Sequence, residues 1–120
     1  MKTVLVADDK ATSRELVRTV LEKSGYTVVE ASDGVEALRS ARESKPDLII
    51  LDLHMPGLDG FGVVREIRLD RELASTPVMA LTASAMQGDR ERAISAGFTS
   101  YLAKPIQLSF LRSEVERMLQ

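Results

Sequence analysis

Residues 47–60 read DLIILDLHMPGLDG, in which the apolar run 48–51 is followed by Asp52 and then by Pro56-Gly57. A short, continuous apolar run that ends in turn residues predicts a strand buried on both faces, as in a parallel sheet. A carboxylate at the edge of a core costs free energy unless a charged or hydrogen-bonding group meets it. The stretch therefore predicts a parallel sheet, and it leaves open which group meets Asp52.

Four further segments resemble this strand: 3–7 (TVLVA), 27–31 (TVVEA), 77–82 (PVMALT) and 99–103 (TSYLA). Longer stretches with helical spacing separate them, and this alternation predicts βα units around a parallel sheet with helices on both faces. The segments at 3–7, 47–53 and 77–82 are nearly all apolar and are expected to be central. The other two are more polar, which is typical of sheet edges. We therefore expect one α/β domain of the (βα)5 type, spanning residues 1–120.

Short polar motifs predict where the helices begin and end. A capping-box pattern, with Glu or Gln three residues after a polar cap, occurs at Thr12, Asp33 and Ser84. Asp59 is a further N-cap candidate, and Gly97 is the expected stop of the fourth helix.

Composition and charge exclude several classes of function. The 16 Lys and Arg residues against 18 Asp and Glu leave a formal net charge of −2, which is no footprint for nucleic acid. Without cysteine the chain has no disulfide, thiol nucleophile or Cys-based zinc site, and its single histidine makes no His-cluster metal site. The sequence lacks an apolar run near the ~20 residues of a membrane span, and its N-terminus lacks a signal-peptide core. We therefore expect a cytoplasmic domain.

Polar residues follow or end the predicted strands, at the edge where ligands bind to an open parallel sheet. These residues are Asp8, Asp9, Asp52, Thr82 and Lys104. Taken singly, each has a simpler interpretation as a turn or cap acid, a strand-end hydroxyl or a solvated lysine. Their joint placement at one rim favours a common site.

Three carboxylates at one rim need a counter-charge, because two unit charges ~4 Å apart repel by about 4 kcal/mol at an effective dielectric near 20. Mg²⁺ removes this repulsion, since it takes one or two carboxylates and keeps positions for water and phosphate oxygens. A carboxylate there can attack phosphorus, and Thr82 and Lys104 can meet the transferred oxygens. His54 is expected to be a solvated loop side chain, because Mg²⁺ prefers oxygen, although its backbone carbonyl is a candidate ligand.

The motifs that carry these residues resemble the receiver domains of bacterial two-component response regulators. The resemblance covers essentially the whole chain and rests on four motifs in the family's order: VADD (6–9), LDLHMPGLDG (51–60), ALTAS (80–84) and YLAKP (101–105). It implies a flavodoxin-like, doubly wound sheet with the strand order 2-1-3-4-5.

The resemblance also implies roles for the acidic residues and for the loop that follows them. Asp52 is similar to the phosphoacceptor of the family. Asp8 and Asp9 match the acidic pair that holds Mg²⁺, with Asp9 as the direct ligand and Asp8 often acting through water. The backbone carbonyl of His54 matches a further metal ligand.

The remaining implied roles concern the phosphoryl group and the switch. Thr82 and Lys104 resemble the hydroxyl and the lysine that meet the phosphoryl oxygens, and Tyr101 matches the aromatic residue that changes rotamer when Thr82 moves. The bond before Pro105 is expected to be cis. His54 and Ser84 match positions that flank the path of the water that removes the phosphoryl group. The sequence does not define the lifetime of that group.

The implied function is a phosphorylation-operated switch. A sensor histidine kinase or a histidine phosphotransfer protein would donate a phosphoryl group to Asp52. The surface formed by the fourth helix, the fifth strand and the fifth helix would then change its affinity for a downstream protein or output domain. Candidate residues on this surface are Arg90, Ile94, Tyr101 and Ile106. Such a domain catalyses at most its own phosphorylation and dephosphorylation.

Two other functions compete with the switch. A Mg²⁺-dependent phosphatase of the haloacid-dehalogenase type also uses an aspartate at a strand end, but that family has a second Asp where this chain has His54. A receiver-like module that binds proteins without phosphorylation is the other alternative, and the intact set from Asp8 to Lys104 speaks against it. The sequence does not identify the cognate kinase, the target or the oligomeric state.

Overall fold

The computed structural model describes residues 1–83 and 88–120. Its five parallel strands lie in the order β2-β1-β3-β4-β5, which confirms the predicted order and the two predicted edges. The strands are β1 Thr3–Ala7, β2 Thr27–Ala31, β3 Leu48–Asp52, β4 Val78–Thr82 and β5 Ser100–Ala103. The helices are α1 Ala11–Lys23, α2 Gly34–Ser44, α3 Gly60–Leu69, α4 Asp89–Ala96 and α5 Leu108–Leu119.

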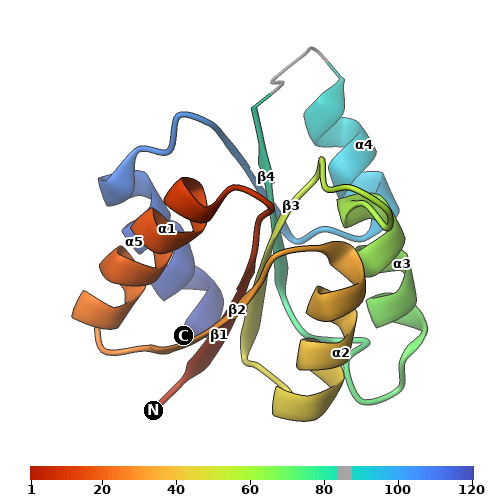
Figure 1. Ribbon diagram of the computed structural model, residues 1–120, viewed down its shortest axis with the longest axis horizontal. Coiled ribbons are helices and arrows are strands. Elements are labelled where there is room, and N and C mark those ends of the chain that lie inside the picture. The colour runs from red at the N-terminus through yellow and green to blue at the C-terminus, as the bar shows by residue number, and fades with distance from the viewer. Residues whose placement is uncertain (84–87) are drawn as a thin grey trace.

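Two layers of helices cover the sheet (Figure 1). Helices α1 and α5 lie on one face, and α2, α3 and α4 lie on the other. Successive strand residues point to opposite faces. Accordingly, Val4 and Val6 of β1 join the core beneath α1 and α5, whereas Leu5 and Ala7 join the core on the other face. All five residues of β3 are buried, so Asp52 ends a strand that is covered on both sides.

The strand register brings the carboxyl ends of the strands to one edge. Ala7 pairs with both Ala31 and Leu51. Asp52 pairs with Leu81, and Thr82 pairs with Ala103. Because the ends are level, the residues that end or follow the strands emerge side by side, as the sequence predicted.

Among the described residues, the predicted N-caps are right at two positions and wrong at one. The carboxylates of Asp33 and Asp59 accept hydrogen bonds from the N–H groups of Glu36 (2.8 Å) and Gly62 (2.9 Å). The prediction of a cap at Thr12 is wrong, because α1 begins at Ala11 with Lys10 as its N-cap. The cause lies one turn earlier in the chain. The Asp8 carboxylate accepts a hydrogen bond from the Lys10 N–H (2.9 Å), and this contact fixes the backbone where α1 begins, ahead of Thr12.

Helix α4 is bounded by two glycines. Gly97 has φ 116° and forms its C-cap, as expected, and Gly88 has φ 93° and forms its N-cap. Both angles fall in the left-handed region that glycine adopts without steric cost. The capping motif expected at Ser84 lies outside the described residues.

Replacing Asp33 with alanine is expected to lower the free energy of unfolding by about 1 kcal/mol, because one N–H group in the first turn of α2 loses its partner. The matched change Thr12→Ala should leave stability nearly unaltered, since this side chain does not cap α1. Urea denaturation followed by circular dichroism compares the two. Equal losses for both variants would contradict the assignment of the caps.

Candidate functional site

The side chains at the centre of the site are Asp8, Asp52 and Lys104, which come from the ends of three different strands. The Lys104 ammonium donates to Asp8 Oδ2 (2.8 Å) and to Asp52 Oδ2 (2.9 Å). Both acids are buried, with exposed fractions of 0% for Asp8 and 4% for Asp52. The charged group that meets Asp52 in this structure is therefore Lys104, which bridges two carboxylates.

Asp9 completes an acidic cluster with these two residues. Each of Asp8, Asp9 and Asp52 offers a carboxylate oxygen, and these three atoms lie within 4.8 Å of one another. Three carboxylates against one ammonium leave two negative charges in excess when all are ionised. A divalent cation with a preference for oxygen ligands matches both the charge and the donor atoms. The residues present therefore fit Mg²⁺.

Asp52 is held by the backbone on its other side. Its Oδ1 accepts a hydrogen bond from the N–H of His54 (2.9 Å), while the His54 side chain is exposed, as predicted. Burial raises the pKa of the Asp52 carboxyl above its ordinary value, and the hydrogen bonds from His54 and Lys104 offset only part of this rise. Burial alone would lower the pKa of Lys104, but its hydrogen bonds to Asp8 and Asp52, together with the negative charges of these two acids, outweigh burial and raise the pKa. The Lys104 ammonium is therefore the cation that offsets the negative charges of Asp8 and Asp52.

The other predicted residues lie around this centre. Thr82 is buried at the end of β4, and its carbonyl accepts from the Lys104 N–H (2.7 Å). Tyr101 is half-buried on β5, and the peptide bond between Lys104 and Pro105 is cis. A hollow of about 390 Å³ lies beside Lys104 and is lined in part by Tyr101, Pro105 and Phe110. The predicted position Ser84 lies outside the described residues.

Two residues next to the site were not predicted from the sequence. Arg14, in the first turn of α1, donates from Nη1 to the backbone carbonyl of Asp8 (2.8 Å). Its Nε donates to Glu30 Oε1 (3.0 Å), at the carboxyl end of β2. The sequence holds one sign of this pair. An arginine follows Asp8 by six residues, and an acid lies near the end of the neighbouring strand.

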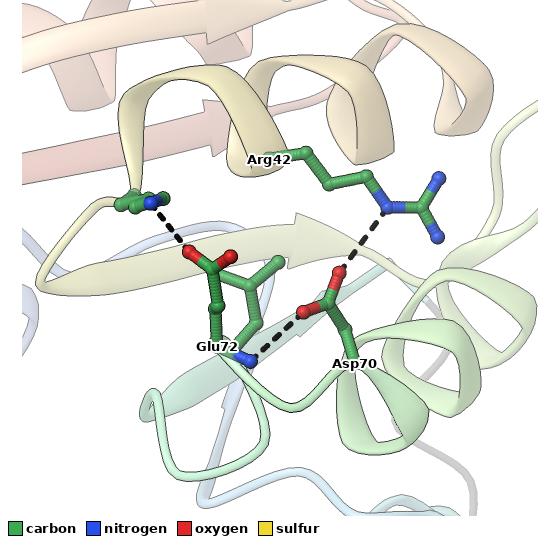
Figure 2. Close-up of a pocket in the computed structure, with 5 residues that line it drawn as sticks. Arg42, Asp70 and Glu72 are labelled. Carbon is green, nitrogen blue, oxygen red and sulfur yellow. Dashed lines mark hydrogen bonds and ion pairs between the residues drawn. The ribbon is translucent and has the colours of Figure 1, made fainter.

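A second hollow, of about 220 Å³, lies between the end of α2 and the turn after α3 (Figure 2). Its charged groups pair with one another: Arg42 Nε lies 3.4 Å from Asp70 Oδ2, and Lys45 forms an ion pair with Glu72. It adjoins the segments that lead into β3 and β4, at the opposite end of the sheet from Asp52. Because its charges neutralise each other, it joins two segments and is not the candidate site.

Comparison with known protein families tests the assignment that this geometry suggests. A model of the response regulator receiver domain matches residues 4–116, which is nearly the whole chain. The chain belongs to the response regulator receiver family. The family assignment that the sequence motifs indicated is therefore confirmed, and the chain is a signalling domain of two-component systems.

Individual relatives agree with the family assignment. The receiver is 40% identical over 107 residues to the polar-differentiation response regulator DivK of Brucella anthropi, covering 89% of this chain and 87% of that protein. It superimposes on the chemotaxis protein CheY4 of Vibrio cholerae with a TM-score of 0.93 and 34% identity, covering 99% of each chain.

A third relative is the receiver domain of a sensor histidine kinase from Pseudomonas aeruginosa, which has a TM-score of 0.91 and 36% identity. The alignment covers 98% of this receiver and 97% of that chain, and that structure has a magnesium ion coordinated in its active-site cleft. These matches favour the receiver over the phosphatase and over the module that works without phosphorylation. In the described part of the receiver, no helix has the length and apolar character needed to cross a membrane.

Proposed function

We propose that this receiver is switched by phosphorylation of Asp52. The observation that carries the proposal is the bridge from Lys104 to both Asp8 and Asp52, beside a third carboxylate. Asp52 has one oxygen directed at the lysine and the other held by the His54 N–H, so the carboxylate is fixed in orientation before a donor arrives. Fixed orientation of the nucleophile is a main source of rate in phosphoryl transfer.

The reaction proceeds between a phosphohistidine of the donor protein and Asp52. An oxygen of the carboxylate attacks phosphorus, the P–N bond to the donor imidazole breaks, and an aspartyl phosphate forms. The imidazole leaves with the electron pair of that bond and takes up a proton. The donor is a sensor histidine kinase or a histidine phosphotransfer protein. Lys104 then pairs with the added phosphoryl oxygens, and the Thr82 hydroxyl meets the same group.

The side chains of Asp8, Asp9 and Asp52, with the backbone carbonyl of His54, would hold Mg²⁺ in this receiver. When bound, the ion neutralises the excess charge of the carboxylates and of the incoming phosphoryl group. The acids themselves supply the oxygen ligands, and the buried position of Asp8 keeps its carboxylate beside Asp52.

The response to phosphorylation is a change in the surface of α4, β5 and α5. Tyr101 is half-buried in β5, and Ile94 of α4 is 46% exposed. Movement of Thr82 toward the phosphoryl group changes the surroundings of Tyr101, which alters the surface offered by Arg90, Ile94 and Ile106 to a downstream protein. A bias of a few kcal/mol between two states is enough for such a switch.

Mg²⁺ is expected to stabilise the folded receiver. At a concentration 100 times its Kd, an ion that binds only the folded state raises the free energy of unfolding by about 2.7 kcal/mol. Urea denaturation with and without Mg²⁺ measures this gain. Asp9→Asn should lose most of it, whereas Asp47→Asn, at the opposite end of β3, should keep it. An equal gain in all three proteins would place the ion elsewhere.

The switch itself is tested with beryllofluoride, which mimics the phosphoryl group. In the presence of Mg²⁺, it should shift the backbone NMR resonances of α4, β5 and α5 in the wild-type receiver and leave those of Asp52→Asn unchanged. Shifts confined to the residues around Asp52 would remove the proposed response of the surface.

A further inference from the structure

The loop between β1 and α1 carries two of the three acids, and it is fixed at several points. The N–H of Asp8 donates to the Ala31 carbonyl (3.1 Å), and its carboxylate accepts from the Lys10 backbone N–H and from the Lys104 ammonium. The remaining polar group of Asp8 is its backbone carbonyl, which accepts from Arg14 Nη1 (2.8 Å). Arg14 therefore contacts the peptide group that joins Asp8 to Asp9.

Arg14 is itself held in place by Glu30. Each carboxylate oxygen of Glu30 binds a different arginine: Oε1 accepts from Arg14 Nε (3.0 Å), and Oε2 accepts from Arg18 Nη1 (2.8 Å). The Arg14 side chain is only 19% exposed, and a hollow of about 290 Å³ lies beside it, lined in part by Glu30 and Ser32. Arg14 and Glu30 both line this hollow, and the ion pair between them holds the guanidinium in its direction.

We propose that Arg14, braced by Glu30, is a positioning residue for Asp9 in the cation site. The peptide group is planar, so the direction of the Asp8 carbonyl determines where the N and Cα atoms of Asp9 lie. Asp9 is exposed, unlike the buried Asp8, and its side chain has less packing to hold it. The hydrogen bond from Arg14 replaces that packing by holding the backbone. This inference rests on the proposed Mg²⁺ site and adds a residue that touches neither the ion nor the phosphoryl group.

The charge of Arg14 and its positioning role predict opposite results when the guanidinium is removed. A cation near a metal site repels the ion, so loss of the charge alone would tighten Mg²⁺ binding. Loss of a group that orients a metal ligand weakens binding, typically by about 10–100-fold. The sign of the change therefore separates the two effects.

The test is an NMR titration of the full chain with Mg²⁺, which gives the Kd of the folded protein. Arg14→Met, which keeps the aliphatic stem, should raise the Kd by about tenfold or more. Its Mg²⁺-free spectrum should also show a broadened or split Asp9 amide resonance. Arg14→Lys retains one donor for the Asp8 carbonyl and should give an intermediate Kd.

Arg18→Met is the matched control, since it removes a cation from the same Glu30 without touching Asp8, and its Kd should stay within about twofold of wild type. An unchanged or lower Kd for Arg14→Met would overturn the inference. If that variant does not fold, Arg14→Lys and Glu30→Gln carry the test, and an unchanged Kd in both would overturn it equally. Failure of the wild type to bind Mg²⁺ would instead refute the proposed function.

Discussion

Asp52→Asn is expected to abolish covalent phosphorylation of the receiver. The change replaces the nucleophilic carboxylate with an amide of nearly the same shape, so the fold should be retained while the reacting oxygen is lost. It also removes one charge from the acidic cluster, leaving Asp8 and Asp9 with Lys104. The expected loss is complete within the limits of detection.

The measurement is incubation with acetyl phosphate and Mg²⁺, followed by intact-protein mass spectrometry. Asp47→Asn is the matched control, because it makes the same chemical change at an exposed residue just before β3, at the opposite end of that strand from Asp52. This control should be phosphorylated at the wild-type rate. An adduct of wild-type yield on Asp52→Asn would assign the acceptor to another residue.

Gly60→Ala is expected to destabilise the receiver and to impair the site. A Cβ atom at Gly60 would lie 2.7 Å from the backbone oxygen of Asp52 and 2.8 Å from the Cα of Leu53. Both atoms belong to the backbone that carries the phosphoacceptor, and the Gly60 N–H donates to the Leu53 carbonyl (3.1 Å). Overpacking of this kind costs roughly 1–3 kcal/mol, and here we expect the upper end of that range because no side chain can yield.

Gly62→Ala, in the same helix, provides the control for Gly60→Ala. Its Cβ would meet Cδ1 at the end of the Leu58 side chain, which can rotate away. Alanine is also favoured over glycine within a helix by about 0.5–1 kcal/mol, so the net change should be small. Urea denaturation measures both variants, and the rate of phosphorylation by acetyl phosphate should fall only in Gly60→Ala. Similar stabilities would show that α3 can move away from Asp52 without cost.

Much of the fold followed from local patterns in the sequence. The apolar runs located all five strands, and the more polar runs at 27–31 and 99–103 identified the two edges. Asp33 and Asp59 located helix starts, because an N-cap depends on residues only a few positions away. The N-cap predicted at Thr12 was wrong because α1 begins before this residue. The hydrogen bond between Asp8 and Lys10, which begins the helix earlier, is not part of the capping pattern.

The candidate site was predicted as a set of residues but not as a set of contacts. The placement of a polar residue at a strand end can be predicted from that strand alone. The contacts of Lys104 cannot, because this residue lies 96 positions from Asp8 and 52 positions from Asp52 in the chain. The sequence assigned Lys104 to the phosphoryl group and left its contact with both acids unforeseen. Arg14 and Glu30 were missed because a charged residue in a helix or on an edge strand is usually solvated. Only the fold brings Arg14 to the Asp8 carbonyl and Glu30 to Arg14.

The most direct test of the central claim is to locate the phosphoryl group chemically. Wild-type receiver is incubated with acetyl phosphate and Mg²⁺ and then reduced with borohydride, which converts an aspartyl phosphate to homoserine. Peptide mass spectrometry identifies the modified position. We predict homoserine in place of Asp52, dependent on Mg²⁺, with Asp8 and Asp9 unmodified. Modification at another acid, or the absence of modification in a protein that binds Mg²⁺, would contradict the proposal that Asp52 is the phosphoacceptor.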